Sequence, residues 1–278
     1  MTRQAFHDAL EQGQFIAAPG VYDGLSARLA EQSGAAALYL TGYGVSSSLL
    51  GQPDAGFLTL DHMADRVRTM CACTSTPLIA DADTGFGDIA ATVHAYEDAG
   101  VSAIQIEDQV FPKRCGHTPG REVVGLDGAV DRIKQALDAR TDPAFKIIAR
   151  TDARTGDGLD AAIERARAFH EAGADILFIE SPESEAELAQ IATAVPGAKM
   201  LANMVEGGRT PFLPPERLDA MGFALAIYPL VGLAAAGHAL GSAYANLSDA
   251  DATHRMSFPA LNRAVGFEQI WQADAAED

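Results

Sequence analysis

A cysteine in a short basic segment carries the clearest chemical signal of this chain. Lys113 and Arg114 precede Cys115, and Gly116 and His117 follow it, with prolines at positions 112 and 119 on either side. Neighbouring positive charge stabilises a thiolate over a thiol, so this cysteine is expected to titrate closer to neutrality than a free one. The segment is typical of a proton donor or a nucleophile. The alternative is a solvated basic loop in which the cysteine is incidental.

A second group of residues is acidic and predicts a site for a hard cation. Asp81 and Asp83 come at the end of one short apolar run, and Glu107 comes at the end of the next. Asp54, in the loop 51–54, could add a fourth carboxylate. Because all these ligands are oxygen, they favour Mg²⁺, or Mn²⁺, over zinc. The alternative for Asp81 and Asp83 is helix capping.

An arginine and several polar residues follow other apolar runs. The planar guanidinium of Arg150 suits a substrate carboxylate, although a structural ion pair with Asp152 or Glu180 is the alternative. Asn203 and Thr41 could supply orienting hydrogen bonds. A divalent cation, an arginine and a tunable thiol together suit a small hydroxy- or oxo-diacid, and chemistry that forms or discharges an enolate.

The apolar runs recur in a regular pattern. Helical stretches end in glycine, as at Gly34, Gly100 and Gly173, and a short apolar run follows each. This pattern is typical of a helix C-cap leading into a strand that is buried on both faces. Eight strands alternating with helices predict an α/β fold, a closed (β/α)8 TIM barrel. The predicted strands are 15–18, 37–40, 78–80, 104–106, 146–149, 176–179, 200–202 and 223–227.

Polar or ionisable residues follow nearly every predicted strand. In a TIM barrel the chemistry lies at the carboxyl ends of the strands. Buried sheet interiors are apolar, so a functional mouth explains such a ring better than a role in stability does. The ring consists of 41–43, 81–83, 107–108, 150–152, Glu180, Asn203 and Tyr228.

The helices carry their own boundary signals, and the chain continues beyond the barrel. Thr59 precedes an amphipathic run, Gly158 opens a helix that continues through 172, and Ser181 is expected to cap a helix before Pro182. After the eighth strand we predict helices over 231–247 and 258–271. The chain is thus one barrel domain, 1–278, with a C-terminal extension, 248–278, that docks on its own barrel or on a neighbouring subunit.

Charge and cysteine content narrow the class of protein. The formal net charge of −18 argues against binding to nucleic acid or to an anionic membrane, because either would be repelled. There is no run of about 18 apolar residues and no apolar signal segment at the start. Three cysteines without zinc-type spacing fit a reducing compartment, and Cys71 and Cys73 are expected to be packing residues. We therefore expect a cytoplasmic protein.

Taken together, six stretches resemble the isocitrate lyase and phosphoenolpyruvate mutase superfamily, over about residues 15–240. The resemblance implies a Mg²⁺ ion at Asp81, Asp83 and Glu107. It also implies a last helix that is swapped between subunits, usually in a homotetramer built as a dimer of helix-swapped dimers. The matching stretches are Tyr39–Gly42, Gly51–Asp54, Asp81–Gly87, Ile106–Gln109, Lys113–His117 and Ala149–Ala153.

The basic cysteine segment also separates the branches of this superfamily. It resembles the lyase branch, which includes 2-methylisocitrate lyase, 2,3-dimethylmalate lyase and the plant petal death protein, whereas phosphonomutases lack the cysteine. Tyr43 stands where the methylisocitrate lyases have a glycine, and its ring should fill the space of a third substrate carboxylate. The resemblance therefore favours 2-alkylmalates or similar diacids, with methylisocitrate and oxaloacetate as further alternatives.

The implied reaction is a retro-aldol cleavage that yields a 2-oxo acid and a second carboxylate. A base removes the hydroxyl proton of the substrate, and Cys115, on a loop that closes over the mouth, protonates the resulting enolate. Tyr43, a metal-bound water or a carboxylate could be the base. Oxaloacetate decarboxylase or hydrolase, phosphonomutase and a non-catalytic metabolite-binding barrel are the alternatives. The expected substrate-binding residues are Thr41, Gly42, Tyr43, Arg114, Gly116, His117, Arg150, Glu180 and Asn203.

Overall fold

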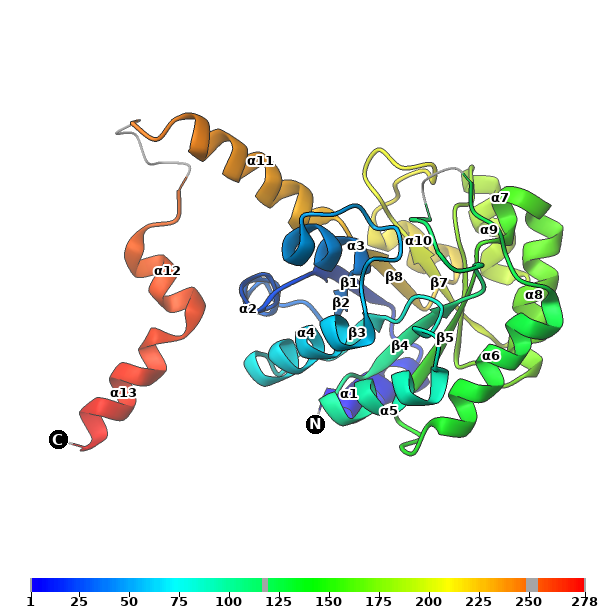
Figure 1. The fold of residues 1–278 in the computed structure, drawn as a ribbon, viewed down its shortest axis with the longest axis horizontal. Coiled ribbons are helices and arrows are strands. Elements are labelled where there is room, and N and C mark those ends of the chain that lie inside the picture. The colour runs from blue at the N-terminus through cyan, green and yellow to red at the C-terminus, as the bar shows by residue number, and fades with distance from the viewer. Residues whose placement is uncertain (1, 117–119, 249–254, 278) are drawn as a thin grey trace.

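The protein folds as a closed barrel of eight parallel strands surrounded by helices (Figure 1). The computed structural model describes residues 2–116, 120–248 and 255–277. Each strand pairs with the next along the chain, and Ile16 on β1 lies opposite Leu225 on β8, which closes the ring. The predicted (β/α)8 fold and all eight predicted strands are confirmed. The strands are β1 Ile16–Val21, β2 Leu38–Leu40, β3 Leu78–Asp81, β4 Ala103–Glu107, β5 Lys146–Thr151, β6 Ile176–Ile179, β7 Lys199–Asn203 and β8 Leu225–Tyr228.

Helices cover the outside of the barrel and one plugs its amino-terminal end. Phe6 and Leu10 of α1 are buried against the inward-facing residues of the strands, so the barrel has a packed core and is no pore. The helices are α1 Thr2–Glu11, α2 Gly24–Gln32, α3 Gly42–Val45, the π-helix η1 Ser46–Leu50, α4 Leu60–Cys73, α5 Ile89–Ala99, α6 Leu126–Ala139, α7 Ala153–Asp157, α8 Leu159–Glu171, α9 Glu185–Thr193, α10 Pro215–Met221, α11 Val231–Ala245, α12 Phe258–Val265 and α13 Phe267–Glu277.

Two of the three predicted helix starts are confirmed. Thr59 caps α4 by accepting a hydrogen bond from the backbone N–H of His62, whose side chain accepts one in return from the N–H of Thr59. Gly158 precedes α8 as expected. The third was wrong, because Ser184, not Ser181, caps α9. Ser181 instead adopts a left-handed backbone conformation, φ 59°, next to the site described below.

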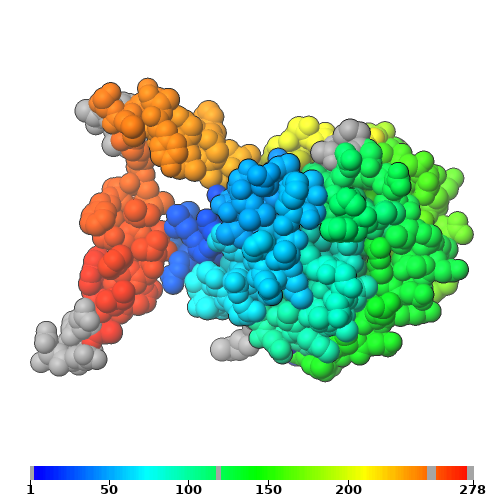
Figure 2. Space-filling model, in the orientation of Figure 1, coloured from blue at the N-terminus to red at the C-terminus, as the bar shows by residue number. Residues whose placement is uncertain are grey.

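The C-terminal helices leave the barrel as an arm (Figures 1 and 2). The predicted single helix over 258–271 was wrong, because Gly266, at φ 92°, ends α12 and α13 follows directly. Ala264 of α12 is buried where α12 packs against α2, whereas Phe258 and Trp271 are exposed. In the space-filling view the arm stands beside the barrel and covers little of it (Figure 2). Part of the predicted extension, 249–254, lies outside the described residues.

In the described part of the chain, no helix combines the length and apolar character needed to span a bilayer. Cys71 and Cys73 lie at the end of α4 and pack, partly buried, against the core, as predicted. Burial raises the pKa of the Cys71 thiol to about 11, which keeps it protonated at neutral pH.

Candidate active site

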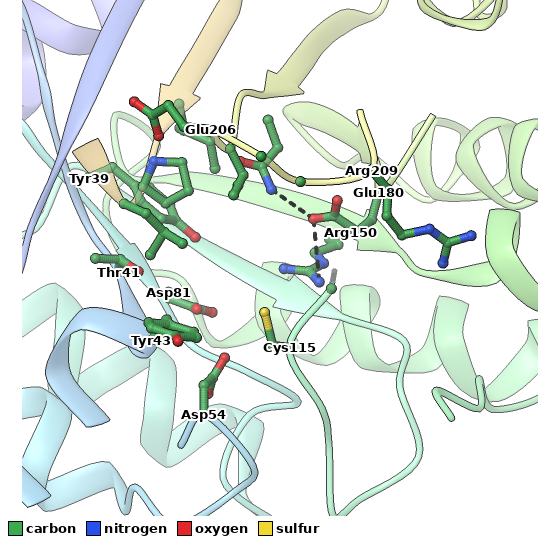
Figure 3. Close-up of a pocket in the computed structure, with 18 residues that line it drawn as sticks. Tyr39, Thr41, Tyr43, Asp54, Asp81, Cys115, Arg150, Glu180, Glu206 and Arg209 are labelled. Atoms are coloured by element: carbon green, nitrogen blue, oxygen red, sulfur yellow. Dashed lines mark hydrogen bonds and ion pairs between the residues drawn. The ribbon is translucent and has the colours of Figure 1, made fainter. Parts of the chain in front are cut away.

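The carboxyl ends of the strands surround a cavity of about 350 Å³ (Figure 3). Most of the residues singled out in the sequence line it, from seven different strand ends and loops. The fold therefore gathers side chains that are far apart in the sequence, as the barrel topology requires. The predicted residues on its surface are Thr41, Tyr43, Asp54, Asp81, Cys115, Gly116, Arg150, Glu180 and Asn203.

The other predicted residues lie beside or outside the cavity. Gly42 and Asp83 contact Asp81, and Glu107 lies next to Arg150, all three buried beneath the surface. Arg114 is exposed, and its side chain lies along Gly120, not in the cavity. His117 lies outside the described residues, so its expected role stays a prediction.

The acidic side of the cavity is built around Asp81. Its two carboxylate oxygens accept hydrogen bonds from the backbone N–H groups of Gly42, at 3.3 Å, and Asp83, at 3.1 Å. A Cβ on Gly42 would lie 2.8 Å from Asp81 Oδ2, so only glycine allows this approach. Asp83 has a left-handed backbone, φ 47°, and this turn at the strand end keeps it near Asp81.

Lys113 connects the cysteine-bearing loop to the acidic side of the cavity. Its ammonium is buried and forms ion pairs with Asp54 and, at 2.7 Å, with Asp83. Burial opposes the charge, but these carboxylates still raise the pKa of Lys113 well above its usual value. Lys113 therefore ties the loop to the acidic wall.

Burial disfavours the charged form of two carboxylates on the acidic side of the cavity. Burial raises the pKa of Asp83 to about 7 and that of Glu107 well above its usual value. Within the described residues, Glu107 Oε1 is buried and has no hydrogen-bond partner. Oxygen donors of this kind fit Mg²⁺. In their present positions, no three acidic, histidine or cysteine side chains of the described chain are arranged to hold one ion.

Arg150 forms the opposite wall together with Asp152. Its Nε and Nη2 donate to the two oxygens of Asp152, at 2.8 and 3.0 Å, so the alternative of a structural ion pair is confirmed. Arg150 nonetheless borders the cavity, and its guanidinium also approaches Glu107 at 3.4 Å and Glu180 at 3.5 Å. Burial alone would raise the pKa of Asp152, but Arg150 and Arg121 hold it below its usual range.

Glu180 and its neighbours form a hydrogen-bonded group next to this wall. Asn203 Nδ2 donates to Glu180 Oε2 at 3.0 Å, and the backbone N–H of Ser181 donates to Glu180 Oε1 at 2.7 Å. The Ser181 hydroxyl donates to the carbonyl oxygen of Gly116 at 2.8 Å. Ser181 thus joins the end of β6 to the cysteine-bearing loop, a role its sequence context did not indicate.

Gly116 lies against both Arg150 and Glu180, which places the loop over the mouth of the cavity. A Cβ at Gly116 would come within 2.5 Å of Arg150 Nη2 and 2.8 Å of Glu180 Cδ. Next to it, the sulfur of Cys115 points between the acidic residues Asp54 and Asp81 and the group around Arg150 (Figure 3). The loop is therefore in a docked position, with its thiol facing the cavity.

Several lining residues were not identified from the sequence. Tyr39 lies within the apolar run of β2, which is typical of a core strand. It nonetheless lines the cavity, and its hydroxyl donates to Gln105 at 3.2 Å inside the barrel. The loop 205–209 follows β7, and the adjacent glycines Gly207 and Gly208 were the one feature of its sequence that indicated a loop at this strand end. An apolar part of the wall consists of Val205, Ile227, Pro229 and Leu230.

The closed parallel barrel, with a polar cavity at the carboxyl ends of its strands, places the protein in the class of (β/α)8 barrels. Residues 6–248 match the family model of phosphoenolpyruvate phosphomutase. The chain belongs to this family, within the phosphoenolpyruvate mutase and isocitrate lyase superfamily, as the sequence motifs predicted.

Relatives within the family are similar over nearly the full chain. The chain is 44% identical to 2,3-dimethylmalate lyase of Eubacterium barkeri over 281 residues, 98% of this chain and 97% of that one. It is 43% identical to 2-methylisocitrate lyase of Escherichia coli over 245 residues, 87% and 82% of the two chains. The solved oxaloacetate acetylhydrolase in complex with 3,3-difluorooxalacetate superposes with a TM-score of 0.94 at 35% identity, covering 99% and 96%.

Proposed function

We propose that the protein is a Mg²⁺-dependent carbon–carbon lyase that cleaves a small 2-hydroxy diacid. One observation carries this proposal: the docked loop directs the Cys115 thiol into a cavity with carboxylates on one side and Arg150 on the other (Figure 3). Such a site can hold a dianion at both ends and supply a proton between them. The similarity to 2,3-dimethylmalate lyase and 2-methylisocitrate lyase supports the same reaction class.

The shape of the cavity favours a substrate with short alkyl substituents. At about 350 Å³ the cavity is at the small end of ligand sites, which suits a diacid of a few carbons. Val205, Ile227 and Leu230 offer apolar surface to an alkyl group. Tyr43 lines the cavity, and its ring would take up space that a third carboxylate would need. We therefore propose a 2-alkylmalate such as 2,3-dimethylmalate ahead of 2-methylisocitrate.

The acidic wall is the proposed magnesium site. Asp81, Asp83 and Glu107 would hold the ion, with Asp54 at the edge and Lys113 displaced from its present ion pairs. When bound, Mg²⁺ would polarise the 2-hydroxy acid end of the substrate and stabilise developing negative charge. The unpartnered oxygen of Glu107 and the raised pKa values of Asp83 and Glu107 are the observations that support this assignment.

The protein residues divide the proton transfers between them. A base removes the hydroxyl proton, the C2–C3 bond breaks, and its electron pair passes to the leaving carboxylate fragment as an enolate. For 2,3-dimethylmalate the products are pyruvate and propionate. Cys115 donates its proton to the enolate carbon, while Arg150, Glu180 and Asn203 orient the substrate. Tyr43 and the carboxylates of Asp54 and Asp81 face the cavity as candidate bases.

A coupled assay tests this function directly. Lactate dehydrogenase and NADH report release of a 2-oxo acid, so 2,3-dimethylmalate, 2-methylisocitrate, citramalate and oxaloacetate are compared with Mg²⁺ present. We expect turnover of a hydroxy diacid, highest for 2,3-dimethylmalate. EDTA should abolish the activity and Mg²⁺ should restore it. If no hydroxy diacid is cleaved, the lyase assignment is wrong.

Oxaloacetate hydrolysis is the second candidate. The TM-score of 0.94 to oxaloacetate acetylhydrolase is the observation that favours it. Its products are oxalate and acetate, which the lactate dehydrogenase assay does not detect. Chromatographic measurement of oxalate from the oxaloacetate incubation therefore separates the two reactions.

We also propose that the arm α11–α13 is exchanged between subunits in a homotetramer. The support is the apolar surface that this arm exposes in a single chain. A cytoplasmic location stays a prediction from the cysteine content.

A further inference from the structure

The cysteine-bearing loop, residues 109–124, has a fixed base. Its two limbs form a bridge between Gln109 and Val123, and the N–H of Val110 donates to the carbonyl of Glu122 at 2.8 Å. The N–H of Val124 donates to the carbonyl of Asp108 at 2.9 Å. The described residues on either side of the loop, among them Cys115 and Arg121, therefore start from a base that is fixed by backbone hydrogen bonds.

Arg121 lies on the second limb, just beyond the bridge, and reaches into the protein. Its side chain is 1% exposed, and its Nη1 donates to Asp152 Oδ1 at 2.7 Å. Its Nη2 donates to the hydroxyl of Thr155. Among the described residues, Asp152 has one other cationic partner, Arg150, which donates to both of its carboxylate oxygens. Asp152 thus connects a loop residue to the arginine of the cavity wall.

We propose that Arg121 is a latch: a positioning residue that couples docking of the Cys115 loop to the orientation of Arg150 through their shared partner Asp152. Gly116 lies directly against the Arg150 guanidinium, so a change in the orientation of Arg150 changes the surface that the loop contacts. Arg121 and Arg150 both bind Asp152. Loss of the Arg121 bond would therefore free the second limb of the loop and, at the same time, weaken the hold of Asp152 on Arg150. Arg121 does not border the cavity and acts through Asp152.

The neighbouring Arg165 offers a matched control. It forms a buried ion pair with Asp108 at 3.0 Å, and Asp108 accepts hydrogen bonds from Thr151 and from the backbone of Asp152. Arg165 belongs to α8 and not to the loop. Loss of Arg165 therefore removes an arginine–aspartate pair from the same network and leaves the bond from Arg121 to Asp152 in place.

The first test measures access to the thiol and needs no substrate. In a Cys71→Ser/Cys73→Ser background, Cys115 is the one remaining cysteine, and its alkylation by iodoacetamide is timed at several pH values. Breaking a buried pair strongly shifts the closed–open equilibrium, so Arg121→Met should speed alkylation by about tenfold at every pH. Arg165→Met should leave the rate within about twofold, because the loop stays latched.

Arg121→Lys keeps the charge and should give an intermediate rate, because a lysine cannot span Asp152 and Thr155 with a planar fork. The proposal is overturned if Arg121→Met alkylates at the wild-type rate, or if Arg165→Met accelerates alkylation equally. Thermal melting of both variants shows whether they lose similar stability.

The second test is kinetic and rests on the proposed lyase function. Arg121→Met should lower kcat by about tenfold or more with a smaller change in KM, because docking of the loop follows substrate binding. Arg121→Lys should recover part of kcat. An equal loss in Arg165→Met would contradict the latch. If the wild-type protein cleaves no substrate, the lyase proposal fails while the alkylation result still decides the latch.

Discussion

At the scale of single residues, the site depends on the absence of a side chain at Gly116. The loop lies so close to Arg150 and Glu180 that an added methyl group would overlap both. Because neither partner is at the free end of an exposed chain, the loop itself would have to move. The close contact of Gly116 with these two residues therefore helps to hold Cys115 over the cavity.

Gly116→Ala should keep the fold but impair docking of the loop. A displacement of about 1 Å at a reacting group can cost about 100-fold, so we expect kcat/KM to fall by about that factor. Gly125→Ala is the control, because a Cβ there meets no atom within 4 Å at the other end of the loop. Steady-state kinetics and thermal melting of both variants provide the measurement. Wild-type kinetics in Gly116→Ala would rule out the docked position as the reactive one.

Cys115→Ser should remove the proton donor and leave binding of the substrate largely intact. General acid catalysis contributes about 10²–10⁴-fold, so kcat should fall within this range while KM changes little. Cys71→Ser, in a packing position, is the control and should retain activity. The coupled assay measures both variants. Full activity in Cys115→Ser would exclude the proton-donor role and leave the family assignment unchanged.

The sequence indicated which residues lie at the site better than it indicated which of them form ion pairs with each other. Asp81, Glu107 and Arg150 could be found because polar groups at strand ends stand out against apolar runs, and Cys115 could be found from the basic residues around it. The pairing of Lys113 with Asp54 spans 59 positions and depends on two loops meeting in space. The sequence places Lys113 two residues before Cys115 and gives no sign of its ion pairs with Asp54 and Asp83.

At the scale of elements, the strands were predictable and some connections were not. A strand buried on both faces shows as a short apolar run, so all eight strands could be recognised. Ser181 has the sequence of a helix cap before proline, yet its left-handed backbone places its hydroxyl on Gly116. Contact with a loop 65 positions away overrides the local cap signal.

One element-scale prediction concerns the ion pair that joins α7 to α9. Arg154 donates from Nε and Nη2 to the two oxygens of Glu187, at 3.0 and 2.7 Å, and this lowers the pKa of Glu187. A lowered folded-state pKa stabilises the protein above the unfolded value, about 4.3, and the gain is lost as pH falls through the folded value. Glu187→Gln should therefore destabilise the protein by about 0.5 kcal/mol at pH 7, since solvent screens the pair.

Urea unfolding at pH 7, 5 and 4 measures this difference. The gap between Glu187→Gln and wild type should shrink toward the lowest pH, where the wild-type carboxylate is protonated in part. Glu185→Gln is the matched control on the same helix turn, because its pair with Arg217 is exposed. A gap that stays constant with pH would show that the charge of Glu187 is not the cause.

At the scale of the whole molecule, a strongly acidic chain would have to bind its proposed anionic substrate through a few positive charges inside the cavity. The net charge of −18 repels anions at a distance, so recognition would depend on the arginines of the cavity, Arg150 and Arg209, and on the cation that the acidic wall would hold. The barrel makes this feasible because it collects every strand end at one mouth.

The arm α11–α13 provides the last prediction, which concerns assembly. Phe258 is 75% exposed and Trp271 is 51% exposed in the single chain, and such apolar surface marks a site of protein contact. If a second copy covers it, Trp271→Glu should raise the subunit dissociation constant by at least about tenfold, because buried tryptophans dominate interfaces. Gln272→Glu, on the same exposed stretch of α13, adds the same charge without removing apolar surface and should have little effect.

Sedimentation over a dilution series measures both variants, and melting temperatures should depend on concentration for wild type more than for Trp271→Glu. Identical association of Trp271→Glu and wild type, or a wild-type protein that is monomeric at every concentration, would exclude exchange of the arm.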